Sequence, residues 1–127
     1  MIRRTILALL ALSSLTPLAM AGEITPWDAG RFSALQAEGR PILIHVTAPW
    51  CPTCRAQHPL VSDLAGAPEN GDLVVFDVDF DSQKDVLRQF NVRQQSTLIS
   101  FRGADERGRA VGITDPKAIA ALVAETR

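Results

Sequence analysis

The two cysteines of this 127-residue chain lie within one four-residue segment, CPTC, as Cys51 and Cys54. A scaffold held together by structural disulfides spreads its cysteines along the chain. A single close pair instead predicts a local, reversible disulfide or part of a metal site. A zinc site would normally need two further ligands, and the chain has only two histidines, His45 and His58. The pair therefore favours redox chemistry.

The cysteine pair stands between two recognisable patterns. Residues 41–46 (PILIHV) form a short apolar, β-branched run that predicts a strand covered on both faces. Apolar residues at helical spacing then predict a helix over about residues 52–65. Cysteines three apart on the first turn of a helix are close enough to form a disulfide. Free backbone N–H groups and the positive pole of the helix favour the thiolate of Cys51. We expect Cys51 to attack a substrate disulfide and Cys54 to resolve the mixed disulfide.

The chain after Gly22 alternates between helical and strand patterns. Thr25-Pro26-Trp27-Asp28 predicts a helix that begins at Thr25 as the N-cap and ends at Gly39. Strands are expected over residues 72–80, 97–102 and 110–113, and further helices over residues 82–90 and from residue 115 onward. Gly103 and Gly108 are assigned to a hairpin loop. The order predicts an α/β fold with a central mixed sheet of four to five strands and helices on both faces.

The first 21 residues have the pattern of a secretory signal peptide. Arg3 and Arg4 precede an apolar stretch too short for a stable membrane anchor, and Ala19 and Ala21 suit cleavage before Gly22. We therefore expect a periplasmic or secreted protein. Its mature form, residues 22–127, would be one small domain with 11 basic and 14 acidic residues, a net charge of −3 that gives no reason to expect nucleic-acid binding.

The sequence resembles the thioredoxin family over nearly all of residues 22–127. Residues 48–54 (APWCPTC) are similar to the family's active-site segment, including Trp50 before the nucleophile. Pro59 falls where the family kinks its active-site helix, and residues 91–98 (NVRQQSTL) resemble the segment before the fourth strand of the thioredoxin fold. The resemblance implies a thiol-disulfide oxidoreductase without a cofactor or bound metal. Its partners would be protein thiols and disulfides, and Trp50, Gln95 and Ser96 would contact the substrate.

The segment CPTC followed by Arg55-Ala56-Gln57-His58 is similar to exported, membrane-tethered reductases of cytochrome c maturation. This local resemblance, and the lack of a charged or histidine residue between the cysteines, favour a reductase over a strong oxidant. A reductase in an oxidising compartment must be recharged, so the resemblance implies a membrane electron-donor protein as its partner. The mature protein is expected to be a soluble monomer.

Two residues depart from the family pattern. Ser96 replaces the proline that the family places, in cis, opposite the disulfide. Because a cis bond before a non-proline residue costs about 3–4 kcal/mol, we expect the Gln95–Ser96 bond to be trans. His45 occupies the strand position of a buried carboxylate that assists the resolving cysteine in thioredoxin. It is a candidate general base for Cys54, with a partly buried histidine bonded to backbone or water as the alternative.

A different function class stays open at this point. His58 follows Cys54 by four residues and lies on the same helix face, so a metallochaperone could bind copper or zinc through the two cysteines and His58. Asp77, Asp79 and Asp81 alternate along the end of a predicted strand. We interpret them as a solvated strand edge that leads into a loop.

Overall fold

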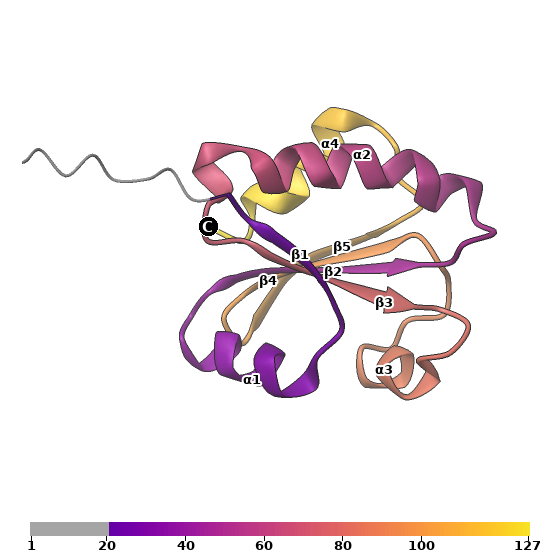
Figure 1. Cartoon of the computed structure of the whole chain (residues 1–127), viewed down its shortest axis with the longest axis horizontal. Coiled ribbons are helices and arrows are strands. Elements are labelled where there is room, and N and C mark those ends of the chain that lie inside the picture. The colour runs from indigo at the N-terminus through magenta and orange to yellow at the C-terminus, as the bar shows by residue number, and fades with distance from the viewer. Residues whose placement is uncertain (1–20) are drawn as a thin grey trace, which may run out of the picture.

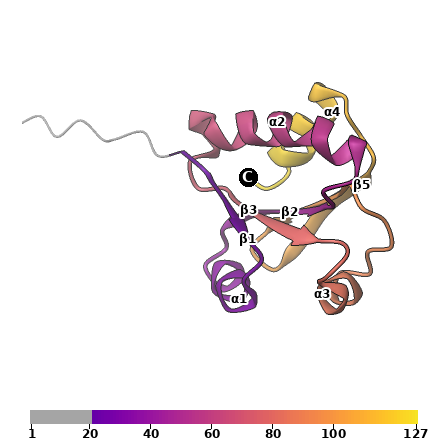
Figure 2. The ribbon, with the colours of Figure 1, turned by 45° about the vertical axis from the view of Figure 1, so that its right-hand side comes forward.

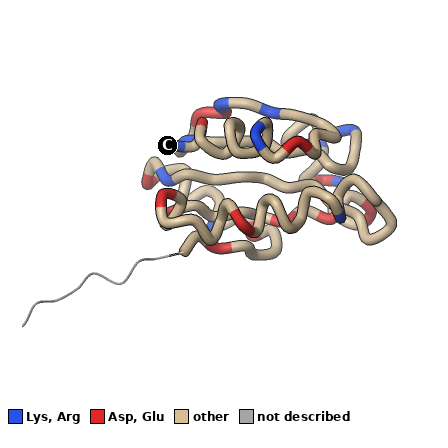
Figure 3. Tube along the Cα trace, turned by 90° about the horizontal axis from the view of Figure 1, so that it is seen from above, with Lys and Arg blue, Asp and Glu red and all other residues tan. Residues whose placement is uncertain are grey.

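The structure is a computed structural model that describes residues 21–127. The predicted signal peptide, apart from its last residue Ala21, lies outside the described residues. Among the residues described, no helix is both long and apolar enough to span a membrane. Basic and acidic residues are interspersed along the trace (Figure 3).

One five-stranded mixed sheet forms the centre of the molecule, as the sequence predicts. Its strands have the spatial order β1-β3-β2-β4-β5. They are β1 (Glu23–Pro26), β2 (Pro41–Thr47), β3 (Val74–Asp79), β4 (Thr97–Arg102) and β5 (Asp105–Val111). β3 pairs in parallel with both β1 and β2, whereas β4 is antiparallel to both β2 and β5. The central strand β2 is buried along Ile42–Val46, in agreement with its continuous apolar run.

Helices cover both faces of the sheet (Figures 1 and 2). They are α1 (Ala29–Ala37), α2 (Pro52–Gly66), a 3₁₀ turn η1 (Pro68–Asn70), α3 (Lys84–Gln89) and α4 (Pro116–Ala124). α1 and α3 lie on one face, over a core that includes Phe32, Phe76 and Phe90, and α2 and α4 lie on the other. The α2 side packs over a second core that includes Leu43 and Ile119. The active-site segment therefore sits where β2 leaves the sheet and enters α2.

The predicted start of the first helix is wrong. Residues 23–26 form the edge strand β1, and α1 begins only at Ala29. Asp28, not Thr25, is the N-cap, since its carboxylate accepts a hydrogen bond of 3.0 Å from the Arg31 N–H. Pro26 suits both a first helical turn and an edge strand, and pairing with β3 decides for the strand.

The hairpin prediction places the last strand too late. β5 begins at Asp105, five residues before the predicted residue 110, and Gly108 lies inside it. A Cβ atom at Gly108 would stand 3.0 Å from Leu122 Cδ1 and closer still to the Glu125 carboxylate. This glycine permits close approach to α4 and does not mark a loop. The remaining predicted elements differ from the structure by at most two residues at their ends.

Candidate active site

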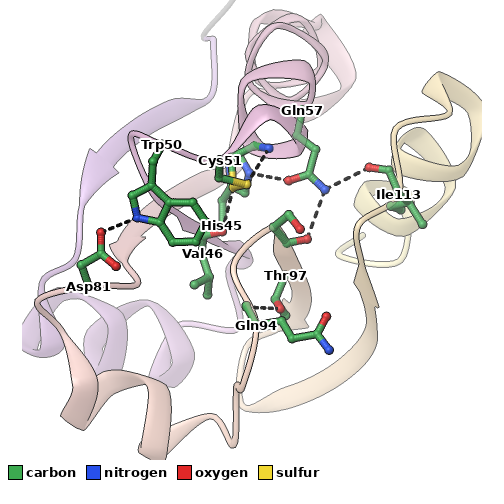
Figure 4. The surroundings of a disulfide bond; sticks show 11 residues. His45, Val46, Trp50, Cys51, Gln57, Asp81, Gln94, Thr97 and Ile113 are labelled. Atoms are coloured by element: carbon green, nitrogen blue, oxygen red, sulfur yellow. Dashed lines mark hydrogen bonds between the residues drawn. A yellow bond between two sulfur atoms is a disulfide. The ribbon is translucent and has the colours of Figure 1, made fainter.

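Cys51 is the N-cap of α2, and Cys54 lies on its first turn. The two residues form a disulfide, with their Cα atoms 5.3 Å apart, and both are about 1% exposed. Cys51 Sγ also accepts a hydrogen bond of 3.1 Å from the Cys54 N–H (Figure 4). This N–H is one of the groups that a helix start leaves without a backbone partner. In the reduced protein it would donate to the Cys51 thiolate, which the positive end of α2 also stabilises.

One carbonyl group connects the resolving cysteine to the loop before β4. The Val46 carbonyl oxygen, at the end of β2, lies 4.0 Å from Cys54 Sγ. The same oxygen accepts a hydrogen bond of 2.8 Å from the Ser96 N–H. Cys54 and Ser96, which are far apart in the sequence, therefore meet at a single backbone atom.

Ser96 has an unusual backbone conformation. No cis peptide bond occurs among the residues described, which confirms the expected trans bond before Ser96. Instead, Ser96 has a φ of 56°, in the left-handed region that non-glycine residues seldom adopt. The residue is 5% exposed and is held through its backbone. Its N–H donates to Val46, and its carbonyl oxygen accepts from the Gly112 N–H at 3.0 Å.

The neighbouring residue Gln95 is half-buried, and its backbone N–H and carbonyl oxygen have no hydrogen-bond partner in the part of the chain that the structure describes. The loop around it is nevertheless fixed, since the Thr97 hydroxyl donates to the Gln94 carbonyl oxygen at 2.7 Å. A free N–H and a free carbonyl oxygen on one residue of a fixed loop can pair with the backbone of another polypeptide.

Trp50 lies on the surface beside the disulfide. Its side chain is 54% exposed, so it is not a core aromatic residue. The indole Nε1–H donates a hydrogen bond of 2.8 Å to Asp81 Oδ2, and the ring packs edge-on against Phe80. The hydrogen bond to Asp81 thus fixes the position of Trp50 (Figure 4), while much of its apolar face stays open to solvent.

His45 lies fully buried under α2, and its tautomer can be assigned. Its Nε2 is 3.0 Å from Gln57 Oε1. The Gln57 amide nitrogen faces two carbonyl oxygens, of Ser96 at 3.1 Å and Ile113 at 2.9 Å, and must donate to both. Gln57 Oε1 is therefore an acceptor, and the His45 Nε2 carries the hydrogen. Burial lowers the pKa of His45 to about 4, so the imidazole is neutral at pH 7.

The other ring nitrogen of His45 faces β3. Its Nδ1 lies 3.8 Å from Asp77 Oδ1, which corrects the interpretation of Asp77 as part of a solvated strand edge. Burial raises the pKa of the Asp77 carboxyl group. Because His45 is neutral at pH 7, the contact is not an ion pair at that pH. With Nε2 bonded to Gln57 and Nδ1 turned to Asp77, neither ring nitrogen forms a hydrogen bond with Cys54.

His58 would be the third ligand in the alternative of a metallochaperone. His58 is exposed, and its ring packs edge-on against that of His45 with centroids 5.0 Å apart. Within residues 21–127, no three histidine, cysteine or acidic residues are grouped closely enough to hold a metal ion.

Sequence reasoning missed Gln57 and the role of Asp77. Gln57 is fully buried and connects α2 to β2, to the loop before β4 and to the segment before α4. A polar residue on the inner face of an otherwise apolar helix was the available signal, since such a residue needs buried partners.

Comparison with known proteins agrees with this geometry. The family model described as Thioredoxin matches residues 27–125. The structure of Trxlp from Edwardsiella tarda EIB202 is similar, with a TM-score of 0.76, 42% sequence identity and coverage of 79% of this chain and 97% of that one. A thioredoxin H-type of Brassica campestris is 30% identical over 89 residues, which are 70% of each protein. A bifunctional thioredoxin reductase/thioredoxin of Mycobacterium leprae (strain TN) is 31% identical over 85 residues, 67% of this chain but only 18% of that longer protein.

Proposed function

The chain belongs to the thioredoxin family, and from that premise we propose that it acts outside the cytoplasm as a reductase of protein disulfides. Its basic activity is thiol-disulfide exchange through Cys51 and Cys54. The observation that carries this conclusion is the disulfide between these residues at the start of α2, where Cys51 Sγ accepts a hydrogen bond from the Cys54 N–H.

The reaction follows from this arrangement. The Cys51 thiolate attacks one sulfur of a substrate disulfide, and the other substrate sulfur leaves as a thiolate and takes up a proton. Cys54 then loses its proton and attacks Cys51 Sγ, which releases the second substrate sulfur and forms the Cys51–Cys54 disulfide. Two electrons pass to the substrate. A donor dithiol must then reduce Cys51–Cys54 by the reverse sequence of steps.

The direction of electron flow rests on the residues around the pair. Strong oxidants of this kind stabilise the nucleophile thiolate well beyond what a helix start provides. Pro52 and Thr53 add no charge next to Cys51. Among the described residues, the polar groups within hydrogen-bonding distance of the sulfurs are the Cys54 N–H and the Val46 carbonyl oxygen, and both are uncharged. These features favour a reductase.

The proposed site of action rests on the sequence of residues 1–21, whose basic start, apolar stretch and small residues fit a cleaved signal peptide. In an oxidising compartment such a reductase needs a source of electrons. We propose a membrane electron-donor protein, with a soluble monomer working between that donor and its substrates. Trp50 precedes Cys51 and has an exposed face, and Gln95 precedes Ser96, whose N–H bonds to the Val46 carbonyl oxygen that Cys54 Sγ also faces. Either partner would dock on Trp50 and the free backbone groups of Gln95.

The decisive experiment is the equilibrium reduction potential of residues 22–127, titrated against glutathione and dithiothreitol after bound metal has been measured. A value near that of thioredoxin, about −270 mV, would support the reductase. A value near that of a strong oxidant, about −120 mV, would contradict the proposed direction of electron transfer and indicate an oxidase of protein thiols. Stoichiometric copper or zinc that is lost in a Cys51→Ser variant would instead support a metallochaperone.

A further inference from the structure

We propose that Gln57 is a positioning residue that clamps the loop of Gln94–Ser96 to the active-site helix and so sets the affinity for polypeptide substrates. The inference rests on the proposed function, because it assigns that loop to substrate binding. Gln57 lies one helical turn after Cys54 and touches neither sulfur, so it acts through the loop and not on the reacting atoms.

Gln57 connects three segments with one side chain. Its amide N–H groups donate to the carbonyl oxygens of Ser96, before β4, and Ile113, before α4. Its Oε1 accepts from the His45 Nε2–H on β2. These bonds measure 2.9–3.1 Å, and the side chain is fully buried. Both donors are used: the Ile113 carbonyl oxygen has no other donor among the residues described, and the Ser96 carbonyl oxygen also accepts from the Gly112 N–H. Loss of the side chain would leave the first carbonyl unpaired, at about 1–3 kcal/mol, and would take one of two hydrogen bonds from the second.

The loop needs such a clamp because its conformation is not favoured by its own sequence. The left-handed conformation of Ser96 costs roughly 1–2 kcal/mol for a residue other than glycine. Three hydrogen bonds to its backbone offset this cost. The Ser96 N–H donates to Val46, and the Ser96 carbonyl oxygen accepts from Gly112 and from Gln57, the only partner that uses its side chain. Gln57 therefore supplies a constraint that a proline at position 96 would otherwise build into the backbone.

The clamp also fixes the backbone of the neighbouring residue Gln95. With Ser96 fixed on one side and the Thr97–Gln94 hydrogen bond on the other, the free N–H and carbonyl oxygen of Gln95 are held in place before a substrate arrives. A substrate chain that pairs with Gln95 then does not have to order the loop. A small disulfide makes no backbone pairing and should not depend on the clamp.

The test compares two substrates. Insulin, whose disulfides are part of a polypeptide, is reduced with dithiothreitol as the electron source, and dithionitrobenzoate, a small aromatic disulfide, is reduced in a single turnover by protein that has been reduced beforehand and freed of dithiothreitol. We expect Gln57→Met to raise KM for insulin at least about fivefold, the equivalent of one lost hydrogen bond, with kcat within about twofold. The rate with dithionitrobenzoate and the equilibrium with glutathione should each stay within about twofold of the wild type. A KM for insulin within twofold of the wild type overturns the inference.

Asn70→Leu is the matched control. Asn70 is also a buried amide, 3% exposed, which donates to the Leu64 carbonyl oxygen at 2.9 Å and accepts from Arg127 at the far end of α2. If it raises KM for insulin as much as Gln57→Met does, the effect is a general loss of stability and the inference fails.

Gln57→Glu provides a second test should Gln57→Met not fold. It keeps the length of the side chain but gives up the two amide donors at pH 8, and we expect the same rise in KM for insulin. A wild type that reduces neither substrate would refute the proposed function itself, a result distinct from an active wild type with unaffected variants.

Discussion

His45 Nδ1 and Asp77 Oδ1 lie 3.8 Å apart across β2 and β3, buried, and neither atom has a hydrogen-bond partner among the residues described. The distance is too long for a direct hydrogen bond. Since Gln57 fixes the hydrogen of His45 on Nε2, a lone pair on Nδ1 faces the carboxylate oxygen. Protonation of Nδ1 would replace this repulsive contact by an attractive one, but burial of the imidazole opposes its protonation.

The first prediction is a loss of stability in mild acid. The pKa of His45 is about 4 in the folded protein against 6.5 for an unperturbed histidine. The unfolded state therefore binds more protons between these values, and stability falls as the pH drops from 6.5 toward 4. Between pH 7 and pH 5 the loss due to His45 should be about 2 kcal/mol, measured as the free energy of unfolding in urea at each pH.

The matched variant for this measurement is His45→Gln, which cannot titrate but keeps a donor that can reach Gln57. It should lose about 2 kcal/mol less than the wild type between pH 7 and pH 5. The raised pKa of Asp77 gives the opposite trend, since the stability that Asp77 contributes is lost as the pH rises. Both proteins contain Asp77, so its effect largely cancels when the two losses of stability are subtracted. Equal losses in both proteins would show that His45 is not buried in its neutral form.

The second prediction concerns the candidate general-base role of His45. Loss of a general base typically slows a step about 10²- to 10⁴-fold. Because both ring nitrogens are turned to Gln57 and Asp77, we expect His45→Gln to slow resolution of a mixed disulfide on Cys51 by less than about threefold. The measurement is the release of a chromogenic thiol from Cys51 in a single turnover at pH 7. Slowing by two orders of magnitude would establish His45 as the base.

The third prediction concerns the surface beside the disulfide. Asp81→Ala removes the only hydrogen bond of the Trp50 indole among the residues described. We expect the Nε1–H of Trp50 to exchange faster with water, and the protein to lose about 0.5–1 kcal/mol of stability. Trp27, which packs among Phe32, Phe76 and Phe90, provides an internal reference in the same NMR spectrum. An unchanged exchange rate at Trp50 would show that Phe80 packing alone holds the ring.

The sequence predicted those parts of the site that depend on neighbouring residues. A buried strand, the cysteine pair and a helix follow one another between residues 41 and 66, and each has a local pattern of its own. The contacts of Gln57 have no such pattern, because Ser96 and Ile113 lie 39 and 56 positions further along the chain. The pairing of His45 with Asp77 depends likewise on the register of two strands.

The errors in the predicted helices and strands also arise from contacts between residues that are distant in the sequence. Pro26 and Gly108 are residues of turns and helix starts by local preference, but tertiary contacts place them in strands. β1 is held by parallel pairing with β3, and β5 contains Gly108 because α4 packs against it. Local preference is a weak prior at sheet edges, where pairing and packing decide.

The last prediction is that glycine, and not proline, suits position 96. Ser96→Gly keeps every backbone hydrogen bond and removes the steric cost of a φ of 56°. Part of that gain is offset by the greater freedom of glycine in the unfolded chain, so we expect about 0.5–1 kcal/mol of added stability.

Ser96→Pro restores the residue of the family pattern, yet it fixes φ near −65° and removes the N–H that donates to Val46. In the loop as it stands, that change should cost about 3 kcal/mol or more. Thermal and urea unfolding of both variants give the comparison. A Ser96→Pro protein as stable as the wild type would mean that the loop can rearrange around position 96 and that the hydrogen bond of the Ser96 N–H to Val46 is not needed to hold it.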